Sequence, residues 1–211
     1  MNYFLKGMSS SKEELEQIIQ QFKRVNMPLE ILFDEYKDLS GITPEDIEKE
    51  IDKRIDKTSR INLICHSLGC NLGVIYAARK QHDSNVKKLI LVSPEIVQTS
   101  LLERSKIKKA YRGEPEILEP DSKSLKEKLE LLRLYMQTAK QAQKDIQRLI
   151  KMEQSILVLN SVGDPYVSQE YLKKSFDRAD KILVKTLDSP NHNPLLKNDD
   201  NCVGQIYEYC K

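Results

Sequence analysis

The sequence predicts an α/β fold built on a mostly parallel sheet. Six short apolar runs, rich in β-branched residues, are separated by longer amphipathic segments. The runs are mostly continuous rather than alternating, which is typical of strands buried on both faces of a parallel sheet. Strand–helix alternation of this kind indicates helices on both faces. At 211 residues the chain has room for one sizeable core, so we expect a single domain spanning residues 1–211.

Each predicted element has its own signal. After the first apolar run, Ser11 and Glu14 form a capping-box pattern that begins an amphipathic helix. Thr43 and Pro44, followed by acidic residues, begin a second helix whose isoleucines recur every four residues. The predicted strands are the apolar runs at residues 3–5, 29–33, 61–65, 89–92, 156–159 and 182–184.

Composition disfavours several classes of protein. Lys and Arg total 34 against 32 for Asp and Glu, a formal net charge of +2, which disfavours a dedicated nucleic-acid binder. No apolar run is long enough to span a membrane. Four cysteines and the lack of a secretory pattern in the first residues indicate reduced thiols and a cytoplasmic location. The three histidines lack metal-ligand spacing, so we expect no metal and no cofactor.

The most informative segment surrounds Ser67. A strand of the buried type leads directly into this serine, and a helical stretch containing Gly69 and Gly73 follows. A strand, a sharp turn and a helix form the context in which a nucleophile elbow presents a serine at the tip of the turn. Gly69 supplies the small residue needed where the helix backbone passes close to the strand. We expect His66 to shape this turn rather than to take part in the chemistry.

This segment resembles the elbow of the α/β-hydrolase family, Gly-x-Ser-x-Gly, with Cys65 in place of the first glycine. The family places its acid after a late strand and its histidine after the last strand. Here Asp164 follows the fifth predicted strand and His192 follows the sixth. The resemblance therefore implies a catalytic triad of Ser67, Asp164 and His192. Glu95, after the fourth strand, is the rival for the acid.

The resemblance also implies an oxyanion hole and the extent of the fold. The two backbone N–H donors of the oxyanion hole would come from Leu68, directly after the nucleophile, and from Met8, in the loop after the first strand. The chain starts at what corresponds to the family's third strand. We therefore expect a minimal α/β-hydrolase with about six strands, mostly parallel, and a helical lid insertion.

The expected lid insertion lies at about residues 98–152, where no credible strand occurs and a long helix is predicted from about residue 122 to 153. The connection leaves the fourth strand at the carboxyl edge of the sheet, where the site should lie, so it is well placed to roof the site. We expect Leu132, Tyr135 and Met136 to line a substrate pocket. The alternative is that these side chains only attach the helix to the sheet.

The predicted function is hydrolysis of a carboxylic ester or thioester. His192 would accept the proton of Ser67, Asp164 would orient the imidazole, and water would hydrolyse an acyl-enzyme at Ser67. The expected partner is a small acyl ester or thioester, without nucleic acid or a membrane span, and the oligomeric state is left open. Two alternatives remain: an acyltransferase on the same fold, and a non-catalytic protein that binds a partner through the long helix.

Overall fold

The computed structural model describes residues 1–7, 10–33, 43–79, 85–94, 125–164, 166–167, 169–176 and 179–211. Its strands are β1 (Asn2–Leu5), β2 (Glu30–Ile31), β3 (Ile61–His66), β4 (Val86–Val92), β5 (Ile156–Ser161) and β6 (Ile182–Leu187). They form a six-stranded sheet with the order β2-β1-β3-β4-β5-β6, and every neighbouring pair is parallel. The predicted parallel sheet is therefore confirmed, although the run at residues 29–33 contributes only the two residues of β2.

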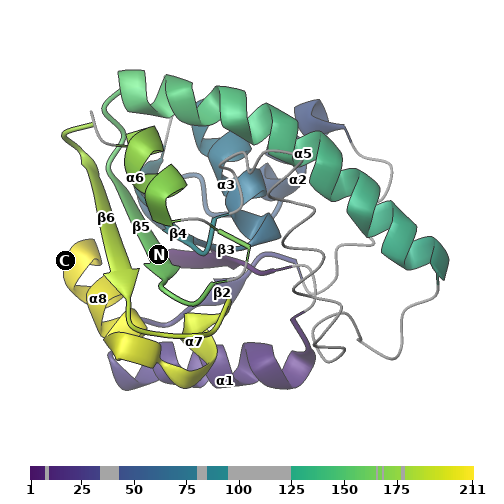
Figure 1. Ribbon diagram of the computed structural model, residues 1–211. Helices are drawn as coiled ribbons and strands as arrows, with labels where there is room; N and C mark the ends of the chain where they lie inside the picture. Colours follow the sequence, from purple (N-terminus) through teal and green to yellow (C-terminus); the bar gives the residue numbers. More distant parts are fainter. Residues whose placement is uncertain are drawn as a thin grey trace.

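Helices cover both faces of this sheet (Figure 1). One face packs against α1 (Lys12–Arg24), α7 (Pro194–Lys197) and α8 (Cys202–Cys210). The other face packs against α2 (Pro44–Asp52), α3 (Leu68–Arg79), α5 (Leu125–Lys151) and α6 (Gln169–Phe176). A 3-10 turn, η3 (Asp199–Asn201), joins α7 to α8. Because both faces are covered, β1, β3, β4 and β5 present apolar side chains to two separate cores.

The predicted capping box begins α1. The Ser11 hydroxyl accepts a hydrogen bond from the Glu14 backbone N–H at 3.2 Å, and the Glu14 carboxylate accepts one from the Ser11 N–H at 3.0 Å. The apolar face of the helix, formed by Leu15, Ile18 and Phe22, is buried against the sheet. Burying these side chains contributes roughly 1.5–3 kcal/mol each, an upper bound that takes the unfolded chain as fully exposed.

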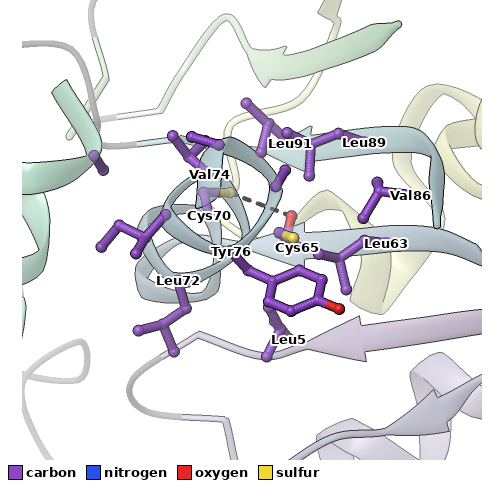
Figure 2. Close-up of a cluster of buried hydrophobic side chains, with 14 of the residues drawn as sticks. Leu5, Leu63, Cys65, Cys70, Leu72, Val74, Tyr76, Val86, Leu89 and Leu91 are labelled. Carbon is purple, nitrogen blue, oxygen red and sulfur yellow. Dashed lines mark hydrogen bonds between the residues drawn. The ribbon is translucent and has the colours of Figure 1, made fainter. Parts of the chain in front are cut away.

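The core beneath α3 supports the end of β3. Figure 2 shows side chains from α3, β3 and β4 meeting there, with Tyr76 and Cys70 on the helix. The Cys70 thiol donates a hydrogen bond to the carbonyl oxygen of Cys65, at a sulfur–oxygen distance of 3.3 Å (Figure 2). The Tyr76 hydroxyl donates to the carboxylate of Asp52 on α2 at 3.1 Å. The first bond ties the first turn of α3 to the strand that precedes it, and the second ties the far end of α3 to α2.

The helix predicted at about residues 122–153 is present as α5, which begins at Leu125 and ends at Lys151. It packs along α3 (Figure 1), and the Asn71 amide of α3 donates to the Thr138 hydroxyl at 3.5 Å. Because β4 and β5 are parallel neighbours, the chain between them must return to the opposite edge of the sheet. The described half of the expected insertion is thus the crossover helix of a βαβ unit, and residues 95–124 lie outside the described ranges.

Candidate active site

Ser67 stands at the tip of a sharp turn between β3 and α3. Its φ angle is 51°, in the left-handed region that non-glycine residues rarely adopt. Such a conformation costs of order 1–3 kcal/mol and persists only where the surroundings hold it. Here the Ser67 N–H donates to the carbonyl of Val92 on β4 at 3.1 Å, and the Ser67 carbonyl accepts from the Cys70 N–H at 2.9 Å. The strand–turn–helix geometry expected of a nucleophile elbow is therefore present.

Gly69 and Gly7 allow two backbone segments to approach this turn. A Cβ atom on Gly69 would lie 2.1 Å from the Leu5 carbonyl oxygen, so the first turn of α3 runs directly against the end of β1. A Cβ atom on Gly7 would lie 2.7 Å from Nδ1 of His66 and 3.4 Å from Cβ of Ser67. The loop that follows β1 consequently begins beside Ser67.

Cys65, which replaces the first glycine of the family pattern, is accommodated by Gly73. A Cβ atom on Gly73 would lie 2.3 Å from the Cys65 sulfur, so the thiol fills the space that a side chain at position 73 would need. Complete burial raises the pKa of the Cys65 thiol well above its usual value. Cys65 is therefore an inert packing group beneath the turn rather than a reactive thiol.

Asp164 and His192 form a hydrogen-bonded pair at the carboxyl edge of the sheet, where the Ser67 turn also lies. Nδ1 of His192 lies 3.0 and 3.1 Å from the two carboxylate oxygens of Asp164. The Asp164 side chain is fully buried, and one of its oxygens also accepts from the Tyr166 N–H at 2.9 Å. Because a carboxylate only accepts hydrogen bonds, Nδ1 carries the proton, and Nε2 of a neutral His192 is left as a proton acceptor.

The loop that carries His192 is attached to the loop that carries Asp164. The Gly163 N–H donates to the Ser189 carbonyl at 2.9 Å, and a Cβ atom on Gly163 would lie 2.6 Å from Cα of Pro190. Farther along, the Asp199 carboxylate accepts from the Ser189 hydroxyl and from the Asn191 amide, each at 2.6 Å. These bonds hold both loops in one arrangement, so the Asp164–His192 pair does not depend on a single contact.

Two aromatic rings border the His192 imidazole. The ring of Tyr166 meets it edge to face, with centroids 4.6 Å apart. The ring of His66 lies with its centroid 5.3 Å away, and its Nε2 is 3.2 Å from the His192 carbonyl oxygen. Burial, and secondarily the nearby His192, lowers the pKa of His66 to about 3, so His66 is uncharged at neutral pH.

The predicted site residues fall into three groups. Ser67, Leu68, Asp164 and His192 all lie in segments that follow the carboxyl ends of strands at one edge of the sheet, after β3, β5 and β6. Met8 and the rival acid Glu95 lie outside the residues that the structure describes, and so does the side chain of Leu132. The remaining two, Tyr135 and Met136, lie on α5.

Tyr135 and Met136 differ in their surroundings. Tyr135 is half-buried against the core that α5 shares with α3. Met136 is 52% exposed. It follows the buried Leu134 by two residues, which places it about 200° around the helix axis, on the side away from α3. Met136 therefore takes no part in the packing of α5 against α3, and its pocket-lining role remains a prediction.

Tyr166 and Asp199 contact the site or its supporting loops, and the sequence reasoning missed both. Tyr166 follows Asp164 by two residues, the spacing at which an aspartate side chain commonly bonds a backbone N–H, which is the one local signal available. Asp199 carries no such signal, because its partners Ser189 and Asn191 precede it by eight to ten residues in an irregular loop.

Two features are absent from the described part of the chain, a cluster of metal ligands and a membrane-spanning helix. Among the residues that the structure describes, no group of three or more His, Cys, Asp or Glu side chains could hold a metal ion. In that same part of the chain, no helix combines the length and the apolar character that crossing a membrane requires.

The chain matches one protein-family model, described as serine hydrolase, over residues 37–189. This match spans more than half of the chain and includes Ser67 and Asp164, and it ends just before His192. No curated protein sequence matches the chain.

Solved structures resemble the whole fold. A carboxylesterase of the thaumarchaeon Nitrososphaera gargenis has a TM-score of 0.68 at 12% identity, over 99% of this chain and 89% of that one. The α/β-hydrolase MGS-MChE2, from a sediment metagenome of the Mar Chica lagoon in Morocco, has a TM-score of 0.69 at 13% identity, over 99% and 89%. The thioesterase domain of the curacin biosynthetic pathway has a TM-score of 0.60 at 10% identity, over 98% and 90%. The chain belongs to the serine hydrolase family and is an enzyme of the α/β-hydrolase fold.

Proposed function

We propose that this enzyme hydrolyses a carboxylic ester or thioester through an acyl-enzyme at Ser67. The observation that carries the proposal is the contact of His192 Nδ1 with both oxygens of the buried Asp164 carboxylate, at the sheet edge where Ser67 stands on its strained turn. A nucleophile, a base and an acid that orients the base are the three roles that acyl transfer to a serine needs.

The steps follow from the protonation states. Nε2 of neutral His192 takes the Ser67 proton as the hydroxyl oxygen attacks the substrate carbonyl, and Asp164 stabilises the imidazolium that forms. The backbone N–H groups of Leu68 and Met8, the two proposed donors, donate hydrogen bonds to the oxyanion. Collapse of the intermediate expels an alcohol or thiol, which takes its proton from His192. Water then attacks the ester at Ser67 with His192 again as the base.

The proposed substrate class rests on the solved structures that share this fold. A carboxylesterase and a thioesterase domain share the fold, so an ester and a thioester are both proposed as substrates.

We also propose that the chain is a single domain whose residues 98–152 include a lid, with Leu132, Tyr135 and Met136 lining the acyl pocket. The four free cysteines fit the proposed cytoplasmic location.

A substrate panel on matched variants tests this function. Wild type, Ser67→Ala and Ser93→Ala are assayed with p-nitrophenyl esters of graded chain length and with a set of acyl-CoA thioesters. Ser93 is a close control, because it is also buried at a strand end with a positive φ of 50°, and its hydroxyl has no hydrogen-bond partner among the described residues.

The two variants should behave differently. Ser67→Ala should lose on the order of 10³-fold or more of turnover, and Ser93→Ala should stay within about threefold of wild type. Equal turnover by wild type and Ser67→Ala would contradict the proposal. Transfer of the acyl group to an added alcohol, in preference to water, would instead identify an acyltransferase.

A further inference from the structure

We propose that His66 is a positioning residue that holds the backbone of His192 against the nucleophile turn. This inference rests on the proposed function, since it assigns His66 a role in orienting the proposed base. It differs from the role expected from the sequence, where His66 only shaped the turn around Ser67.

The first support is the geometry of the His66 ring. His66 precedes Ser67 directly, and its Nε2 lies 3.2 Å from the backbone carbonyl oxygen of His192, 126 residues farther along the chain. A carbonyl only accepts hydrogen bonds, so Nε2 carries a proton and donates it. One imidazole ring thus joins the residue next to the nucleophile to the residue that supplies the base.

The second support is the way in which the ring is held. A Cβ atom on Gly7 would lie 2.7 Å from Nδ1 of His66, so the backbone after β1 closes over that side of the ring. His66 is buried, with little room to turn its Nε2 away from His192. Nδ1, the atom that faces Gly7, is buried and has no hydrogen-bond partner among the described residues, which leaves Nε2 as the ring's one described hydrogen-bonding atom.

The third support is that the other hydrogen bonds holding the His192 loop run to Asp164 and Asp199. The side chain of His192 is held by Asp164, and the segment before it is held through Ser189 and Asn191, which bond Asp199. None of these bonds connects the His192 loop to the turn that carries Ser67. The hydrogen bond from His66 does make that connection, so we expect it to help set the separation of base and nucleophile.

The charge of His66 is compatible with this role. Among the described residues, the His192 ring and the Gly7 backbone face the His66 ring, and the Asp164 carboxylate lies beyond the His192 ring. A second positive charge beside His192 would oppose the imidazolium that forms during the reaction. Because burial lowers the pKa of His66, the ring is too weak a base to compete with His192 for the Ser67 proton.

Substitutions that move or remove the donor test the proposal. The side-chain nitrogen of Gln reaches about as far from the backbone as Nε2 of His, whereas the nitrogen of Asn ends near the position of Nδ1. His66→Gln keeps the donor in place, His66→Asn withdraws it, and His66→Phe keeps the ring without a donor. Tyr76→Phe is the control, because it deletes a hydroxyl that bonds Asp52 away from the site.

We expect kcat to fall roughly 10–100-fold in His66→Phe and in His66→Asn, as for a small misplacement of reacting groups. KM should change by less than about threefold, because the acyl pocket is untouched. His66→Gln should recover most of the lost kcat, and Tyr76→Phe should lower thermal stability while leaving kcat unchanged. Should His66→Phe not fold, the comparison of Gln with Asn decides the question by itself.

Three results would overturn the positioning role. They are equal kcat in the Gln and Asn variants, a loss confined to KM, and a loss of thermal stability without a loss of kcat. Ser67→Ala is assayed alongside to separate the two proposals. If Ser67→Ala is inactive while the His66 variants turn over normally, only the positioning role fails. If Ser67→Ala retains full turnover, the proposed function fails and the positioning role fails with it.

Discussion

Gly69→Ala should damage the nucleophile turn more than any other single methyl group added nearby. The new Cβ would lie 2.1 Å from the Leu5 carbonyl oxygen, 2.6 Å from the Leu5 carbonyl carbon and 2.7 Å from the Lys6 carbonyl oxygen. Ordinary contact begins at 3.4 Å, so helix and strand must separate by about 1 Å. All three obstructing atoms belong to backbone, and β1 is hydrogen-bonded to strands on both sides.

Because β1 is fixed in this way, the turn at Ser67 has to move instead. A displacement of about 1 Å between reacting groups costs on the order of 10²-fold in rate. Overpacking of this kind costs about 1–3 kcal/mol of stability. We therefore expect kcat/KM for the best p-nitrophenyl ester to fall about 100-fold, with a lower thermal unfolding midpoint.

A control for Gly69→Ala comes from the same helix. In the double variant Gly73→Ala, Cys65→Ala, the methyl group replaces the sulfur that would obstruct it, and the two Cβ atoms lie an acceptable 3.6 Å apart. This variant should keep kcat/KM within about fivefold of wild type. The reasoning is refuted if Gly69→Ala turns over at the wild-type rate, or if both variants lose activity equally.

Three further outcomes are expected. Asp164→Asn should lower ester turnover about 10³–10⁴-fold while Glu95→Gln has a mild effect; the reverse ranking, in steady-state assays, would make Glu95 the acid. Burial lowers the pKa of His66 from 6.5 to about 3, so the unfolded chain binds more protons in that window and stability is lost as pH falls through it. His66→Gln should flatten this loss in unfolding midpoints measured from pH 4 to 7, and an unchanged slope would contradict the assignment. Met136→Trp should leave the unfolding midpoint unchanged because Met136 is largely exposed; a shift toward shorter acyl chains would support a pocket role, and unchanged chain-length preference would refute it.

The strands and the order of the site residues could be predicted because their signals are local. A continuous apolar run such as the one before Ser67 reports burial on both faces of a sheet, whatever lies around it. Parallel strands place their carboxyl ends at one edge, so Asp164 and His192 could be assigned to the same edge as Ser67 from chain order alone. The capping box at Ser11 and Glu14 is local in the same sense.

Contacts between distant segments could not be predicted. The bond from His66 to His192 joins residues 126 positions apart, and no periodicity records it. For the same reason, the sequence does not show that the Cys65 thiol fills the space beside Gly73. The apolar character of Met136 likewise does not show which side of α5 packs on α3, which is the side occupied by Leu134 and Thr138.

The chemistry at Ser67 is tested most directly by labelling with a fluorophosphonate probe, followed by mass spectrometry of the digested protein. The probe forms a covalent adduct with a serine that a neighbouring base activates. We predict a single adduct on Ser67 in wild type, and labelling slowed on the order of 10³-fold in His192→Ala. An adduct on a different serine, or no adduct in a preparation that hydrolyses esters, would contradict the assignment of Ser67 as the nucleophile.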